Sequence, residues 1–279
     1  MRNENTTPGP EGLAALRARF DREIRREAVP DSPGARIETS ADGRVVRQVA
    51  APGEGWSGVL WSDLDEAGAD AAIAGELARC RELGLAEYEW KTYGHDGPAD
   101  LGARLSAAGF VADTRETVLM GAVERVLDEV GEAPPPAGVT LREITSPGDV
   151  DLLARAHEAA FGRVRPALMA EVRHRLETDP EHLVVVVAMA GELPVCGARM
   201  ELREGTGFAG LWGGGTHPDW RGRGIYRSLI AHRARIAAAR GVEWLQVDAS
   251  EDSRPILQRL GFAVLGTTTP YEWTAPTAP

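Results

Sequence analysis

Apolar residues recur at two spacings along the chain, and the two spacings predict different elements. Positions three or four apart share one face of a helix, whereas continuous or alternating apolar runs are typical of strands. Helical spacing predicts helices over residues 11–28, 69–83, 100–110, 147–161 and 166–176, and another that begins near residue 225. Strands are predicted over residues 36–39, 44–50, 58–64, 86–93, 117–120, 139–144, 183–189 and 195–202. Helices and strands are interspersed, so the expected fold class is α/β with a mixed sheet.

A loop rich in glycine and arginine precedes the helix near residue 225. It reads Arg221-Gly-Arg-Gly224 and follows a strand that ends near the glycine run 213–215. Glycines let a backbone come close to a ligand, and free amides at a helix start favour an anion. Arginine side chains pair well with phosphate. The segment therefore predicts a pyrophosphate site, although it lacks the Lys-Ser/Thr ending of a P-loop and the Gly-x-Gly-x-x-Gly spacing of a dinucleotide fold.

The loop and the segments after it resemble one known family. Arg221-Gly-Arg-Gly224, with His217-Pro218 before it, resembles motif A of the GNAT superfamily of acyl-CoA-dependent N-acyltransferases. Residues 240–250 look like that family's fifth strand, and residues 253–262, which end in Leu-Gly-Phe, look like its next helix. The resemblance covers roughly residues 139–273 and implies acetyl-CoA as the co-substrate. The cofactor-binding residues that it implies are Gly215, Thr216, His217, Arg221, Gly222, Arg223, Gly224, Ile225, Tyr226, Ser250 and Ser253.

The resemblance implies an enzyme that transfers an acetyl group from acetyl-CoA to a primary amine of a small molecule, directly, in a ternary complex. A general base would take a proton from the amine, and the candidates are Asp248, Glu158 and Glu201. Many relatives carry a tyrosine that protonates the leaving thiolate, but the matching position here is Leu257. No metal is implied, because the six histidines show no ligand-like spacing. Two alternatives stay open: a non-catalytic acyl-CoA-binding sensor or scaffold, and an acetyltransferase that acts on a protein amino group.

The N-terminal half repeats the order of elements of the C-terminal half, which predicts two GNAT-like domains in tandem. Where the first copy should hold its pyrophosphate turn stands Asp65-Glu-Ala-Gly68, whose two carboxylates would repel phosphate. We therefore expect a degenerate GNAT-like domain, and an unrelated α+β cap is the alternative. The predicted divisions are a disordered lead-in over residues 1–10, the degenerate domain over 11–130, a proline-rich linker over 131–138 and the catalytic GNAT domain over 139–279.

Composition and charge indicate which classes of binding partner are expected. The formal net charge of −11 argues against a general nucleic-acid binder. No apolar run approaches the ~20 residues that span a membrane, and the first residues lack the apolar core of a signal peptide. The two cysteines do not suggest a disulfide framework. We expect a cytoplasmic protein with a small-molecule amine substrate and no nucleic-acid or membrane partner; the oligomeric state is left open.

Overall fold

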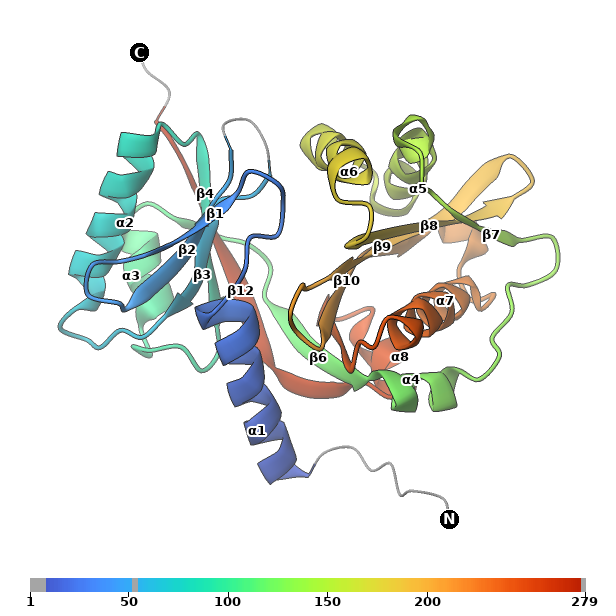
Figure 1. Ribbon diagram of the computed structural model, residues 1–279, viewed down its shortest axis with the longest axis horizontal. Helices are drawn as coiled ribbons and strands as arrows, with labels where there is room; N and C mark the ends of the chain where they lie inside the picture. The colour runs from blue at the N-terminus through green and yellow to red at the C-terminus, as the bar shows by residue number, and fades with distance from the viewer. Residues whose placement is uncertain (1–8, 52–54, 277–279) are drawn as a thin grey trace. The chain divides into compact units, whose positions relative to one another are not determined.

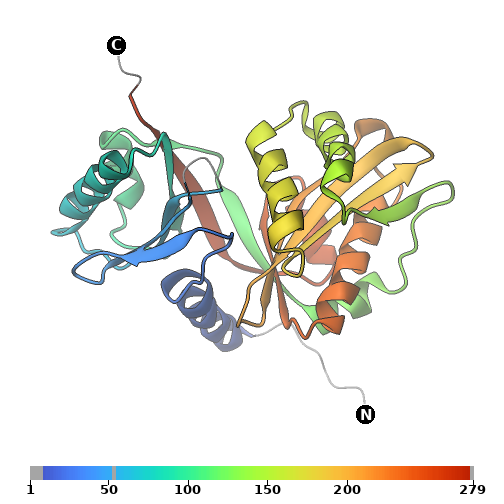
Figure 2. The same cartoon turned by 45° about the horizontal axis from the view of Figure 1, so that its top comes forward.

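The chain folds into two compact units. The computed structural model describes residues 9–51 and 55–276 (Figures 1 and 2). The C-terminal unit contains Leu119–Val264, and the N-terminal unit contains the described residues up to Val118 and from Leu265 onward. None of the described helices is long and apolar enough to cross a membrane.

The C-terminal unit is a mixed sheet with helices on both faces (Figure 1). The strand order is β6-β11-β10-β9-β8-β7. The strands are β6 (Glu116–Ala122), β7 (Thr140–Glu143), β8 (Leu183–Ala190), β9 (Leu193–Leu202), β10 (Phe208–Thr216) and β11 (Trp244–Ala249). Helices α5 (Val150–Phe161) and α6 (Pro166–Thr178) pack on one face. The other face carries α4 (Val123–Val130), α7 (Ile225–Ala239) and α8 (Arg254–Arg259).

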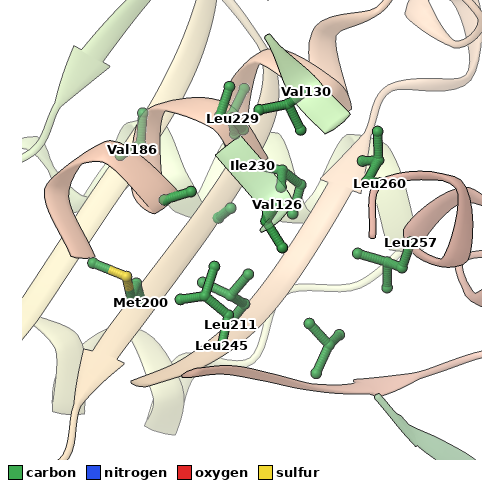
Figure 3. Packing of buried hydrophobic residues seen from close by; sticks show 14 of the residues in the cluster. Val126, Val130, Val186, Met200, Leu211, Leu229, Ile230, Leu245, Leu257 and Leu260 are labelled. Atoms are coloured by element: carbon green, nitrogen blue, oxygen red, sulfur yellow. The ribbon is translucent and has the colours of Figure 1, made fainter. Parts of the chain in front are cut away.

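The continuously apolar sequence of β8 is explained by its packing on both faces of the sheet. Val184 and Val186 pack into the core under α7, whereas Val185 and Val187 pack into the core under α5 and α6. Successive side chains of a strand point to opposite faces, so a strand covered on both faces needs apolar residues at every position. Figure 3 shows the core under α7, where Leu229 lies among apolar side chains of the strands.

The N-terminal unit has the strand order β1-β2-β3-β4-β12. Its strands are β1 (Arg36–Thr39), β2 (Val45–Val49), β3 (Gly58–Ser62), β4 (Glu87–Tyr93) and most of β12 (Ala263–Thr274), with the short β5 (Val111–Ala112) also paired to β12. Its helices are α1 (Pro10–Phe20), which continues as a π-helix over Asp21–Arg26, α2 (Ala69–Leu83) and α3 (Leu101–Ala107). Trp90 packs in the core with α2 and α3, whereas Tyr93, on the opposite face of β4, contacts Phe20 of α1.

We predicted the domain boundary at the proline-rich segment, residues 131–138, but this segment lies within the C-terminal unit. Side chains of α7 hold this segment by its carbonyl groups. Arg235 Nη2 donates to the Gly131 oxygen over 2.9 Å, and Ser228 Oγ donates to the Pro134 oxygen over 3.1 Å. The segment therefore packs as part of the C-terminal unit.

The two ends of the chain also differ from the predicted divisions. The predicted catalytic domain includes the last strand, but β12 pairs antiparallel with β4, from Thr268 opposite Tyr93 to Thr274 opposite Glu87. The disordered lead-in predicted over residues 1–10 lies outside the described residues as far as residue 8, and α1 begins at Pro10.

Candidate active site

A bulge interrupts β10 close to its end. The antiparallel pairing of β10 with β9 shifts register between Trp212 and Gly215. Gly213, inside the shift, has a φ of 62°, a left-handed conformation that glycine adopts without steric cost. A bulge takes backbone groups out of the regular ladder and often re-aims them at a functional site.

Strands β10 and β11 part from each other just before this bulge. They pair in parallel from Phe208 with Trp244 to Gly210 with Gln246. Beyond these residues β10 continues to Thr216 and β11 continues to Ala249, but these described parts of the two strands do not pair with each other. The sheet therefore has backbone edges at which an extended ligand can form hydrogen bonds in the manner of a strand.

The glycine loop leads directly into an uncapped helix start. Gly222 and Gly224 have φ values of 72° and 84°, and no protein atom lies within 4 Å of a Cβ built on either residue. Gly224 occupies the N-cap position of α7, which has no side-chain cap. The first amides of a helix have no partner within the helix and carry partial positive charge. Open space beside such amides fits a phosphate group.

Two arginines hold this loop in shape. Arg221 Nε donates to the Thr216 oxygen over 3.1 Å. Arg223 Nη2 donates to the Asp219 oxygen over 2.9 Å, and its guanidinium lies 4.6 Å from the ring centre of Trp220. Both arginines are exposed. Because a guanidinium has five N–H groups, each arginine keeps donors for an anion while it supports the loop.

Two aromatic side chains of α5 lie against the bulge. A Cβ built on Gly213 would lie 2.9 Å from Cε1 and 3.0 Å from Nε2 of His157. A Cβ on Gly215 would overlap the ring of Phe161. The glycines therefore let α5 approach the strand, and the two rings meet edge to face with centroids 5.5 Å apart.

This part of the chain matches a known family. Residues 150–262 match the model of the acetyltransferase (GNAT) family. These residues belong to the GNAT family. They run from the start of α5 to the residues just after α8 and include the bulge, the glycine loop and α7. The C-terminal unit is therefore an acyltransferase domain.

Solved structures extend the similarity to almost the whole chain. A functionally unknown conserved protein from Staphylococcus epidermidis is 11% identical, with a TM-score of 0.64 over 92% of this chain and 98% of that one. A GCN5-related N-acetyltransferase from Kribbella flavida is 17% identical, with a TM-score of 0.61 over 87% of this chain and 91% of that one. A tandem GNAT protein from the clavulanic acid biosynthesis pathway is 15% identical, with a TM-score of 0.56 over 98% of this chain and 91% of that one. These matches confirm the predicted tandem GNAT fold. Curated proteins give no match.

Three of the predicted residues lie at the end of β10 and in the turn that follows it. Gly215 pairs with β9, and Thr216 Oγ1 lies 3.2 Å from Cys196 Sγ. Nδ1 of His217 accepts the N–H of Asp219 over 3.1 Å, so this ring caps the short helical turn that follows. The side chains of Thr216 and His217 are thus engaged within the protein.

At the start of α7, the side chains of the predicted residues Ile225 and Tyr226 also pack within the protein. Ile225 is buried in the core, so a ligand in the GNAT loop would meet its amide and not its side chain. The ring of Tyr226 lies against Gly214, whose Cβ would be 2.8 Å from it. Burial raises the pKa of Tyr226, so the phenol stays protonated at neutral pH.

The two predicted serines form the turn before α8. The Oγ atoms of Ser250 and Ser253 are 3.2 Å apart, and Ser250 Oγ accepts the Ser253 N–H over 3.3 Å. Ser250 is exposed and Ser253 is half-buried. Their placement leaves contact with acetyl-CoA a prediction.

Glu201, one of the three predicted bases, is an ion-paired carboxylate. Burial alone would raise its pKa, but Arg199, Arg203 and Arg175 lower it to about 2. Arg199 Nε lies 2.9 Å from its Oε1. In the register of β9 and β10 it stands opposite Gly210, before the bulge. Such a carboxylate is a weak proton acceptor at neutral pH.

The other two predicted bases differ in their exposure. Glu158 is exposed on α5, although its neighbour His157 is buried. Asp248 is half-buried on β11 and accepts a hydrogen bond from Gln246 Nε2 over 3.1 Å. Its neighbour Val247 packs in the core under α7, so Asp248 lies on the opposite face of the sheet. The structure therefore places Asp248, and not Glu158, at the sheet.

Leu257 is a core residue and not part of a catalytic surface. It is fully buried, and Figure 3 shows it beside Leu260 in the cluster under α7. The position at which many relatives carry a tyrosine is therefore both apolar and closed.

The helix start that matches the glycine loop in the N-terminal unit is occupied by a carboxylate. Asp65 Oδ1 accepts the Gly68 N–H over 2.8 Å, and its other oxygen lies 2.9 Å from Arg44. The backbone bond from Gly68 and the contact with Arg44 lower the pKa of Asp65. A carboxylate at this helix start would repel a phosphate, and the loss of the pyrophosphate loop stays a prediction.

Proposed function

We propose that the protein is an acetyl-CoA-dependent N-acetyltransferase that transfers the acetyl group directly to a primary amine of a small molecule in a ternary complex. One observation carries the proposal. A bulged strand parts from its parallel neighbour and runs into a glycine loop at an uncapped helix start. This arrangement offers donors for both the arm and the phosphates of acetyl-CoA, within a GNAT domain.

The backbone does most of the work in this proposal. The amides from Gly222 to Tyr226, with Arg221 and Arg223, bind the pyrophosphate. The unpaired edge of β10 holds the pantetheine arm, and the amides of the bulge polarise the thioester carbonyl. Acetyl-CoA supplies an activated acetyl group when bound, and the protein accelerates its transfer by holding the two reactants in line.

Asp248 is the best placed of the three predicted bases. It lies beyond the point where β11 leaves β10, on the face opposite α7. Glu201 is tied to arginines, and Glu158 faces solvent. We further propose a cytoplasmic protein without nucleic-acid or membrane partners, a proposal that rests on composition.

A non-catalytic acyl-CoA-binding sensor is the second candidate, and the burial of Leu257 favours it. No hydroxyl stands at the position from which many relatives protonate the thiolate. A CoA thiolate is nevertheless a tolerable leaving group near neutral pH. Turnover therefore has to distinguish an enzyme from a sensor.

The test measures free thiol release from acetyl-CoA with a panel of small primary amines, together with the affinity for acetyl-CoA. Gly224→Glu places a carboxylate in the proposed phosphate site. Gly205→Glu is the matched control, because Gly205 also has a left-handed φ, of 70°, and open space around its Cβ position, but lies in the turn before β10.

We expect amine-dependent thiol release by the wild type and by Gly205→Glu. Gly224→Glu should bind acetyl-CoA at least about tenfold more weakly, which corresponds to about 1.4 kcal/mol. Tight binding without release would support the sensor or point to a protein amino group as the acceptor. Equal affinity of the two glutamate variants would refute the phosphate site.

A further inference from the structure

The ring of His157 is fixed between two glycines of the sheet. It belongs to α5, where Val150, Leu153 and His157 share the face that packs on the strands. Cδ2 of His157 lies 3.5 Å from the Cβ position of Gly197 on β9, and Nε2 lies 3.0 Å from that of Gly213 on β10. A side chain at Gly213 would push the ring away, whereas one at Gly197 would first meet Leu153 and Ala156 of α5. The sequence therefore reserves space for this ring at the bulge.

Nε2 of His157 is a buried acceptor without a partner. The residue is 6% exposed, and Nε2 has no hydrogen bond within the described chain. The backbone of Gly213 favours the charged ring, against the larger effect of burial on its pKa. We assign the proton of the neutral ring to Nδ1, because Nε2 has no partner within the described chain. A ring protonated at Nδ1 presents a bare lone pair at Nε2.

The surroundings keep this ring neutral. Burial, then the charges of Arg199 and Arg165, lower the pKa of His157 to about 4. Arg199 is ion-paired with Glu201, and its Nη1 lies 3.4 Å from the Cβ position of Gly213. A neutral acceptor beside these cations favours an uncharged N–H donor over an ammonium group.

We propose that Nε2 of His157 accepts the N–H of the acceptor amine and takes its proton during acyl transfer. The proposal rests on the proposed N-acetyltransferase function. In this step a C–N bond forms between the amine and the acetyl carbonyl carbon, and the C–S bond of the thioester breaks. The nitrogen becomes more acidic as it gives its lone pair to carbon, so even a weakly basic imidazole can take the proton. The proton then passes to the departing thiolate, which leaves an amide and a free thiol as the products.

Two features distinguish His157 from the carboxylates considered above. Its free atom lies at the bulge itself, whereas Asp248 is bonded to Gln246 and Glu201 to arginines. Its placement depends on the glycine at position 213, because a Cβ there would lie within 3.0 Å of the ring.

The test uses two isosteric variants of the full chain. His157→Asn keeps an amide near the position of Nδ1 and removes the atom at Nε2. His157→Gln places an amide near Nε2 that accepts a hydrogen bond but does not take a proton. Thiol release is measured with the best amine of the panel, and the melting temperature and the acetyl-CoA affinity are measured for each variant. Asp248→Asn is the comparison. His232→Asn is the matched control, in which His232 of α7 loses its bond to Glu143 of β7.

We expect kcat to fall about 100-fold in His157→Asn and His157→Gln, with acetyl-CoA affinity unchanged. The KM for the amine should rise in His157→Asn and stay near the wild-type value in His157→Gln. A merely structural role would lower the melting temperature of both variants without this split in KM.

Three outcomes would overturn the proposal. The first is a His157→Asn variant that keeps kcat within about threefold of the wild type. The second is a loss of turnover in Asp248→Asn alone. The third is a wild type that releases no thiol with any amine; this result removes the proposed function itself, and the role of His157 falls with it.

A measurement on the wild type covers the case in which neither His157 variant folds. The ¹⁵N resonance of Nε2 is followed while the same amine is added with coenzyme A, which carries no acyl group. The proposal expects a shift of this resonance only when both compounds are present, and no shift would contradict it.

Discussion

Acid should destabilise this protein through one identified group. The pKa of His157 falls from its ordinary 6.5 to about 4 in the folded chain, first because of burial and then because of Arg199 and Arg165. Between these two values the unfolded chain binds a proton that the folded chain does not bind. The stabilisation is therefore complete above about pH 6.5 and is lost as the pH falls toward 4.

The size of the loss follows from the two pKa values. The shift corresponds to about 3 kcal/mol when both states are protonated. Between about pH 7.5 and about pH 5 the loss amounts to about 2 kcal/mol, because the unfolded histidine is then almost fully charged and the folded one is still mostly neutral. Glu201 does not interfere in this window, since its pKa falls from 4.5 to about 2 and its contribution is lost at lower pH.

Urea unfolding of the wild type and of His157→Gln at the two pH values measures this term. Groups shared by the two proteins cancel in the comparison, so the wild type should lose about 2 kcal/mol more than the variant. Fluorescence and circular dichroism should be compared, because a chain of two units need not unfold in one step. Losses that agree within about 0.5 kcal/mol would show that the folded ring takes up a proton freely, and the neutral acceptor would be refuted.

Two further substitutions probe the packing around the site. Gly215→Val should lower the free energy of unfolding by about 1–3 kcal/mol, because a side chain at this position overlaps Phe161, and it should weaken acetyl-CoA binding; an unchanged melting temperature would contradict the close packing of α5 on the bulge. Glu201→Gln should cost about 3–5 kcal/mol, because it leaves Arg199 without its closest carboxylate, but folded protein should keep its turnover. A folded Glu201→Gln without turnover would restore Glu201 as a candidate base.

Local chemistry explains what could be predicted from the sequence. The left-handed φ angles of Gly222 and Gly224 are a property of glycine itself, and a helix that follows such a loop starts without a side-chain cap. The same holds for β8, where uninterrupted apolar residues predict cover on both faces. These features depend on neighbours in sequence, so a linear pattern contains them.

The choice of a general base depends on the direction in which each side chain of α5 points. The spacing of apolar residues in the sequence predicts this direction only in part. One residue along a helix turns the side chain by about 100°. Glu158 therefore faces solvent while His157 faces the sheet. The helical spacing of Val150 and Leu153 already places residue 157 on the buried face, and this signal was available. What no spacing could give is the contact between this ring and the bulge at Gly213.

The boundary between the two units could not be predicted from the order of residues along the chain. Three prolines indicate a spacer, but the segment that contains them is bound through its carbonyl groups to side chains of α7, which lie about a hundred residues later. Core residues of the C-terminal unit also come from before that segment. Val126 and Val130 of α4 pack against α7, as Figure 3 shows, and Leu119 of β6 joins the same cluster. A cut at residue 139 would remove all three from the core that they complete. The proline-rich segment therefore connects two parts of one core, and the boundary lies instead where β6 and β12 pass from one unit to the other.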